Sequence, residues 1–134
     1  ILDSVLFDLG SSELKPEGRE FLALFVPVYS NAIFSSNQVA EQIQHVVIEG
    51  HTSSTGGWDY NMKLSLDRAR SVSETISNFT FNAKEQFQTR MLVAGRGELD
   101  ADQSEDRSGD RKVIFRFQFK SDRFLHWFME QRGL

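Results

Sequence analysis

Several side chains able to bind a small anion gather between residues 49 and 72 of the sequence. The apolar run Val46-Val47-Ile48 is followed by a loop rich in Gly, Ser and Thr, and then by a helical pattern that carries Asn61 and Arg68. Backbone N–H groups at the start of a helix attract anions, and an arginine just inside the helix can grip a carboxylate through two hydrogen bonds. This order of residues predicts a pocket for a small ligand that bears a carboxylate.

The helix that follows this loop is expected to have separate packing and binding faces. Residues that step by three and four positions along it are typical of a buried helix surface: Met62, Ser65, Ala69, Val72 and Ile76. Asn61, Leu64 and Arg68 follow the same spacing on an adjacent face, which leaves them available to a ligand. The alternative for Arg68 is a solvated side chain, or one that pairs with Asp67 or Glu74.

Residues in and around this stretch also form a long, spaced motif. Within the stretch the motif consists of Gly50-His51-Thr52, Tyr60-Asn61, Leu64-Ser65, Arg68-Ala69 and Val72. Elsewhere it consists of Val5-Leu6-Phe7-Asp8 with Ser12, Leu14 and Gly18, then Gly95-Arg96-Gly97, and Asp110-Arg111-Lys112-Val113. Over about residues 4–120 the chain therefore resembles the OmpA C-terminal-like family, which also includes the periplasmic part of the flagellar stator B subunit.

The resemblance implies non-covalent binding of peptidoglycan through the diaminopimelate residue of its stem peptide. It also implies that Asp8, Thr52 and Arg111 line the pocket beside the helix residues. At Ser53 the chain departs from the family, which usually has an aspartate there to meet the ligand's ammonium group. A hydroxyl supplies no charge, and charge-assisted hydrogen bonds are roughly twice as strong as neutral ones. We therefore expect Ser53 to give a weaker ligand site than that of a typical relative.

Other polar residues have simpler explanations than ligand binding. Asp59 is close enough in sequence to compensate for the missing carboxylate, but the favoured role is that of a cap or loop residue before the helix. Asp8 has the alternative of pairing with a neighbouring strand or loop. His51 is expected to be a structural donor that closes the loop, because no second histidine stands at metal-ligand spacing. The acidic residues of segment 98–106 lack the spacing of an EF-hand and predict a solvated loop.

Hydrophobic periodicity predicts a single domain over residues 1–134, in the α/β (α+β) class. Strands are expected at residues 3–8, 45–50, 90–95 and 111–120. Helices are expected from Pro16 onward and at residues 38–44, 60–78 and 122–131. This order predicts a two-layer sandwich, in which a βαβαβ-type mixed sheet carries helices on one face. Pro27 should bend or end the first helix, and the segment around residues 29–42 is interpreted as an insertion relative to the family.

Composition excludes several classes of protein. The net charge of −4 argues against a non-specific nucleic-acid binder. The absence of cysteine excludes disulfides and thiol nucleophiles. No acid–base pair, metal-ligand cluster or activated nucleophile is recognisable, so we expect neither an enzyme nor a cofactor or metal. The apolar run at residues 21–28 is interrupted by Pro27 and is far shorter than the ~20 residues of a membrane-spanning helix.

Two functions follow as hypotheses. The first is a peptidoglycan-binding anchor of an envelope or stator-like complex, in the periplasm of a Gram-negative-type bacterium. A segment outside this chain would attach the anchor to the inner or outer membrane. The second is a structural or dimerisation module whose pocket was weakened or lost with the aspartate replaced by Ser53. A homodimer contact is expected either from Phe124, Trp127 and Phe128, which have helical spacing, or from the segment 29–42.

Overall fold

A three-stranded mixed sheet forms the centre of the computed structural model, which describes residues 1–120 and 122–133 and their side chains except those of residues 122–125. The central strand β1 (Ile43–His51) runs parallel to β2 (Met91–Gly95) and antiparallel to β3 (Lys112–Phe119). The predicted mixed sheet and α+β class are confirmed.

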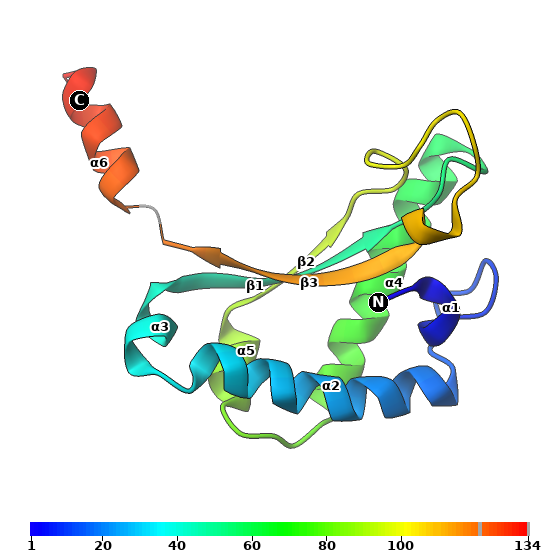
Figure 1. Ribbon diagram of the computed structural model, residues 1–134, viewed down its shortest axis with the longest axis horizontal. Coiled ribbons are helices and arrows are strands. Elements are labelled where there is room, and N and C mark those ends of the chain that lie inside the picture. Colours follow the sequence, from blue (N-terminus) through cyan, green and yellow to red (C-terminus); the bar gives the residue numbers. More distant parts are fainter. Residues whose placement is uncertain (121, 134) are drawn as a thin grey trace.

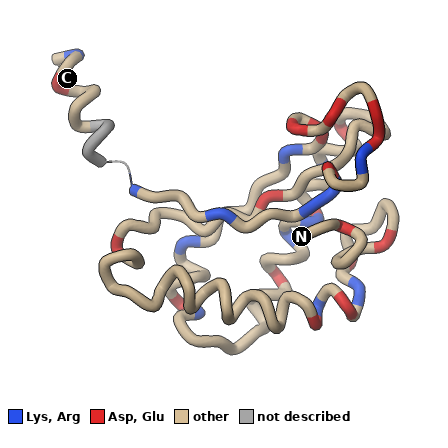
Figure 2. The backbone as a smooth tube through the Cα atoms, in the orientation of Figure 1, with Lys and Arg blue, Asp and Glu red and all other residues tan. Residues whose placement is uncertain are grey.

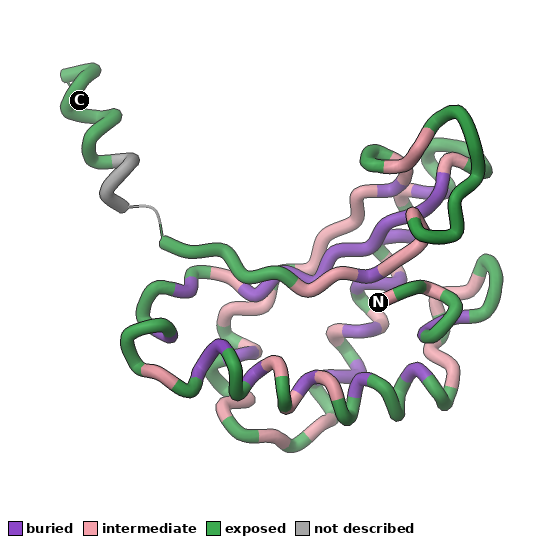
Figure 3. The backbone as a smooth tube through the Cα atoms, in the orientation of Figure 1, coloured by how far each residue is buried: buried purple, intermediate pink, exposed green. Residues whose placement is uncertain are grey.

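Helices α2 (Pro16–Phe34), α4 (Trp58–Ser77) and α5 (Lys84–Thr89) pack against the sheet and form one core with it (Figure 1). The fully buried members of this core come from the N-terminal segment, from all three helices and from β1 and β3: Leu6, Leu22, Val26, Val46, Ile48, Ala69, Val72, Ile76, Phe87 and Val113. Figure 3 shows that buried positions follow β1 and the inner sides of these helices. The core therefore holds the start of α4 at a fixed position beside the end of β1.

The strand predicted at residues 3–8 is wrong. These residues form a short helix, α1 (Asp3–Leu6), flanked by isolated bridges from Leu2 to Lys112 and from Phe7 to Leu14. Leu6 and Phe7 are adjacent in sequence and are both buried. A strand would point them to opposite faces, whereas the turn of α1 brings both side chains into the core.

Pro27 does not end the first helix, because α2 continues to Phe34, whereas a bend at Pro27 stays a prediction. Proline removes one backbone hydrogen bond, but buried residues before and after it, including Val26 and Ile33, hold the helix on the core. The second half of the segment 29–42 forms α3 (Asn37–Gln42), and the Ser36 hydroxyl caps its start. The interpretation of this segment as an insertion stays a prediction.

The chain after the sheet forms α6 (Asp122–Gln131), which projects from the end of β3 away from the other helices (Figure 1). The Trp127 side chain is about half exposed, whereas the side chain of Phe124 lies outside the described residues. The long loop between β2 and β3 ends in the 3-10 turn η1 (Ser108–Asp110). Among the described residues, no helix combines the length and apolar composition needed to cross a lipid bilayer.

Candidate functional site

A pocket of about 260 Å³ lies where the N-terminal segment, the loop after β1, the start of α4 and the loop before β3 meet. One water takes up about 30 Å³ of liquid volume, so the pocket has room for a group the size of an amino-acid end. Figure 2 shows charged residues at this end of the molecule, mainly along the loop between β2 and β3. The lining residues are Asp3, Leu9, Gly10, Thr52, Ser53, Thr55, Gly56, Tyr60, Asn61, Leu64, Arg68, Asp106 and Arg111.

The structure brings most of the predicted site residues together in this pocket: Thr52, Ser53, Asn61, Leu64, Arg68 and Arg111. The Asp8 side chain is exposed and is not among the lining residues, although its backbone carbonyl accepts a hydrogen bond from Arg68. The N-cap of α4 is Gly57, so Asp59 stands in the first helical turn and is not the cap that the sequence predicted. The helix begins two residues earlier than expected, which places Asp59 inside it.

Arg68 is a buried cation, and each of its three guanidinium nitrogens already donates a hydrogen bond. Its Nη1 lies 2.9 Å from Asp3 Oδ2, and its Nε donates to the Ser11 carbonyl at 2.9 Å. Its guanidinium also lies over the Phe7 ring at 5.0 Å from the centroid, and the side chain is only 3% exposed. Neither Asp67 nor Glu74 is its partner, since these carboxylates pair with other residues of α4. Arg68 therefore ties the N-terminal segment to α4 as well as lining the pocket.

Arg111 is the more accessible of the two pocket arginines, with 28% of its side chain exposed. Its Nη1 lies 2.8 Å from Asp106 Oδ1 and donates to Ser53 Oγ at 3.4 Å. Its Nε is 3.8 Å from the same Asp3 oxygen that pairs with Arg68. The pocket thus combines two arginines and two aspartates in one connected set of charges.

Asp3 and Asp106 line the pocket, and the sequence predictions did not name them as site residues. Asp3 was assigned to a strand, and Asp106 was assigned to a solvated acidic loop. Both reach the pocket only because the fold brings distant segments against α4 and β1. Nothing in the sequence distinguishes Asp106 from the other acidic residues of segment 98–106.

Asn61 organises the loop between β1 and α4, which spans residues 52–57. The residue is 2% exposed, and its Nδ2 donates to the carbonyls of Ser53 at 3.4 Å and Thr55 at 3.1 Å. Gly56, in the same loop, has φ +100°, a conformation that favours glycine. The Asn61 amide thus holds a loop whose backbone turns sharply in front of the helix.

Replacing Asn61 with aspartate should destabilise the domain and weaken ligand binding. The carboxylate would face two carbonyl oxygens without a proton to donate, and an unsatisfied buried polar group costs about 1–3 kcal/mol. Urea denaturation of Asn61→Asp measures the loss, with Asn37→Asp in the exposed first turn of α3 as the control. An Asn61→Asp domain as stable as the parent would contradict this role.

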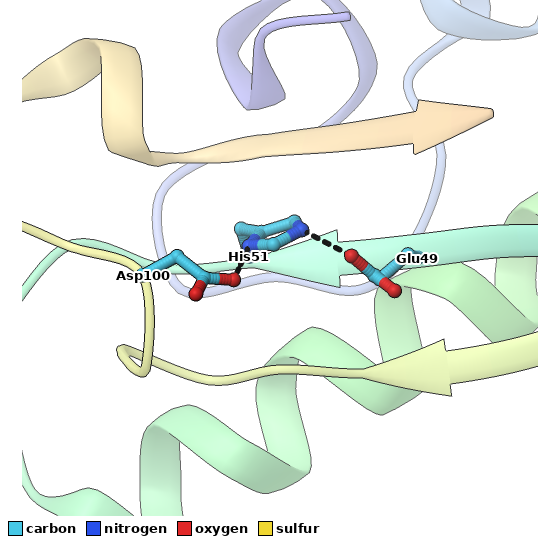
Figure 4. Close-up of side chains that lie close together, drawn as sticks. All are labelled: Glu49, His51 and Asp100. Carbon is cyan, nitrogen blue, oxygen red and sulfur yellow. Dashed lines mark hydrogen bonds and ion pairs between the residues drawn. The ribbon is translucent and has the colours of Figure 1, made fainter. Parts of the chain in front are cut away.

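His51 lies in a separate cluster with Glu49 and Asp100 (Figure 4). Its Nε2 is 2.8 Å from Glu49 Oε1, and its Nδ1 is 3.5 Å from Asp100 Oδ2. The two carboxylates approach different ring nitrogens, and each also pairs with an arginine: Glu49 with Arg116 and Asp100 with Arg96. Hydrogen bonding and the charge of Arg96 lower the pKa of Asp100. This arrangement fits a network that fastens the β2–β3 loop to β1 better than it fits a metal site.

The fold and the pocket define a small α+β domain with a charged pocket at the start of α4. The chain belongs to the OmpA family, whose family model matches residues 6–114. This membership confirms the resemblance found in the sequence.

Curated relatives share moderate identity with the chain. It is 34% identical over 126 residues to the Zorya protein ZorB of Escherichia coli strain ATCC 8739, covering 84% of this chain and 52% of the relative. It is also 34% identical over 116 residues to outer membrane protein A of Bordetella avium, covering 80% of this chain and 50% of the relative. The chain thus spans about half the length of the curated relatives it matches.

Solved structures share the fold at lower identity. The periplasmic domain of Helicobacter pylori MotB superposes with a TM-score of 0.67 at 13% identity, covering 98% of this chain and 83% of that one. The peptidoglycan-associated lipoprotein of Burkholderia pseudomallei superposes with a TM-score of 0.55 at 21% identity, covering 85% of this chain and 88% of that one. At these identities the likeness establishes the fold.

Proposed function

We propose that the domain binds peptidoglycan non-covalently through the diaminopimelate residue of the stem peptide. The observation that carries the proposal is the set of two arginines and two aspartates in one pocket at the start of α4. The side-chain end of diaminopimelate bears an ammonium and a carboxylate on a single carbon. A pocket with both signs of charge complements such a group better than it complements a simple anion.

The two arginines have different parts in this proposal. Arg111 is partly exposed, so it meets the ligand's carboxylate from the solvent side. Arg68 is buried and paired with Asp3, so it stabilises the pocket wall. Its positive charge lies behind Asp3, which partly neutralises it. Thr52 and Ser53 lie at the end of β1 and provide hydroxyls beside these charges.

Peptidoglycan binding would anchor a larger, stator-like complex to the cell wall. The names of the relatives favour this role, since they include a peptidoglycan-associated lipoprotein and the periplasmic domain of MotB. We infer a periplasmic location in a Gram-negative-type bacterium, with attachment to the inner or outer membrane through a segment outside this chain.

Co-sedimentation with purified, diaminopimelate-containing sacculi tests the proposal. The parent domain should pellet with sacculi and should bind a free stem tripeptide that ends in diaminopimelate. A tripeptide with lysine at that position lacks the side-chain carboxylate of diaminopimelate. It should bind at least about tenfold more weakly, since a charged hydrogen bond contributes about 1.5–3 kcal/mol. Arg111→Ala should lose a similar factor for the diaminopimelate peptide.

Arg107→Ala is the matched control for Arg111→Ala. Arg107 is in the same loop, pairs with Asp102 and Glu105, and does not line the pocket. The Arg107→Ala domain should bind sacculi as tightly as the parent domain does. A parent domain that stays in the supernatant and is dimeric by analytical ultracentrifugation would favour the second candidate, a dimerisation module. The projecting helix α6, with its half-exposed Trp127, is the feature that favours that alternative.

A further inference from the structure

Asp106 is the carboxylate of the pocket that faces the solvent. Its side chain is 51% exposed, whereas that of Asp3 is only 13% exposed. Asp3 is also committed to the buried Arg68 at 2.9 Å. A cationic group that enters the pocket therefore meets Asp106 before it meets any other described carboxylate in the lining.

The β2–β3 loop, residues 96–111, presents this carboxylate in a fixed place. Hydrogen bonds from the Ser53 hydroxyl and then from Thr55, together with the charge of Arg111, hold the pKa of Asp106 below its ordinary value. The Ser54 hydroxyl donates to the Glu105 carbonyl at 3.4 Å, which joins the same two loops again. Asp106 is thus ionised at neutral pH and is held against the loop that follows β1.

We propose that Asp106 receives the ammonium group of the ligand, so that the β2–β3 loop supplies the negative charge of the binding site. This inference rests on the proposed function and names the residue that selects a zwitterionic ligand end. Ser53 then has a supporting role, because its hydroxyl favours the ionised form of Asp106 and also accepts a hydrogen bond from Arg111.

The pairing of Asp106 with Arg111 explains how one ligand carbon could satisfy both charges. The two side chains approach within 2.8 Å, so a positive and a negative group stand next to each other at the pocket surface. The end of diaminopimelate also carries adjacent opposite charges. When its carboxylate faces Arg111 and its ammonium faces Asp106, each ligand charge lies next to a protein charge of opposite sign.

Calorimetric titration of Asp106→Asn with two peptides tests the inference. The first peptide is the stem tripeptide ending in diaminopimelate. The second is the same peptide with the side-chain amine of its diaminopimelate acetylated. Asp106→Asn should weaken binding of the free-amine peptide by about tenfold or more, because the charge-assisted contact is lost. The acetylated peptide should bind the parent more weakly, and Asp106→Asn should not reduce that affinity further.

Two further variants complete the design. Glu105→Gln removes a neighbouring loop charge outside the pocket lining and should change the affinity by less than about threefold, the scale of an exposed charge pair. Asp106→Glu keeps the charge and should retain most of the binding that Asp106→Asn loses. Thermal unfolding of each variant checks that the domain remains folded.

Three results would overturn the inference. Equal weakening of both peptides by Asp106→Asn would mean that Asp106 acts only by positioning Arg111. Unchanged binding of the free-amine peptide would mean that another group receives the ammonium. A parent domain that binds neither peptide would overturn the proposed function and this inference with it, whereas the first two results leave the proposed function intact.

Discussion

Gly50→Ala is expected to unfold the domain or to lower its free energy of unfolding by roughly 3 kcal/mol or more. A Cβ at this position would overlap the backbone carbonyl oxygen of Ser65, because the backbones of β1 and α4 approach closely there. A flexible side chain could rotate away from such an overlap, but a helix backbone cannot. The strand and the helix would have to separate, and the pocket between their ends would open with them.

Gly109→Ala is the matched control for this substitution. Gly109 lies in the turn before β3, where an added Cβ would meet no atom within 4 Å and where φ is not positive. Its variant should unfold at the same urea concentration as the parent. If Gly50→Ala also unfolds with the parent, the close packing of β1 on α4 is not as tight as the structure indicates.

Arg68→Ala is expected to lower the free energy of unfolding by about 3 kcal/mol, because removing one partner of a buried ion pair leaves the other charge uncompensated. Among the described side chains, Asp3 would keep its more distant neighbour Arg111, at 3.8 Å. The carbonyl of Ser11 would lose its donor, and the ring of Phe7 would lose its cation contact. Ligand binding should fall as well, since the N-terminal segment forms part of the pocket wall.

Arg70→Ala separates this effect from a general loss of helix charge. Arg70 is two positions further along α4 and pairs with Glu74, with both side chains more than half exposed. Exposed pairs of this kind contribute about 0.3–0.5 kcal/mol. Urea titrations of the two variants should therefore differ by several-fold in their loss of stability. Similar losses for both would show that Arg68 is not a buried tie.

The parts of the fold set by local pattern could be predicted from the sequence. The spacing of Asn61, Leu64 and Arg68 placed them on one side of a helix, and the structure has them lining one pocket. The central strand β1 and the antiparallel β3 also agree with their predicted positions within a few residues. In each case neighbours along the chain determine the geometry.

The remaining features depend on contacts between distant segments. Pro27 disfavours a helix locally, yet packing against the core outweighs the lost hydrogen bond. Asp3 becomes a site residue only because α1 brings it to Arg68 on α4. Asp106 joins the pocket because the β2–β3 loop folds back onto the residues after β1. No periodic pattern in the sequence predicts these contacts between distant segments.

The division of the pocket between the β1–α4 loop and the β2–β3 loop has an evolutionary consequence. Loops on a protein surface accept substitutions and insertions more readily than the elements they connect. If the negative charge comes from Asp106, natural variation in the β2–β3 loop can retune the site for a different wall chemistry, including amidated stem peptides. The helix α4 and the core beneath it would not have to change, so lineages could diverge in specificity while the anchor keeps its architecture.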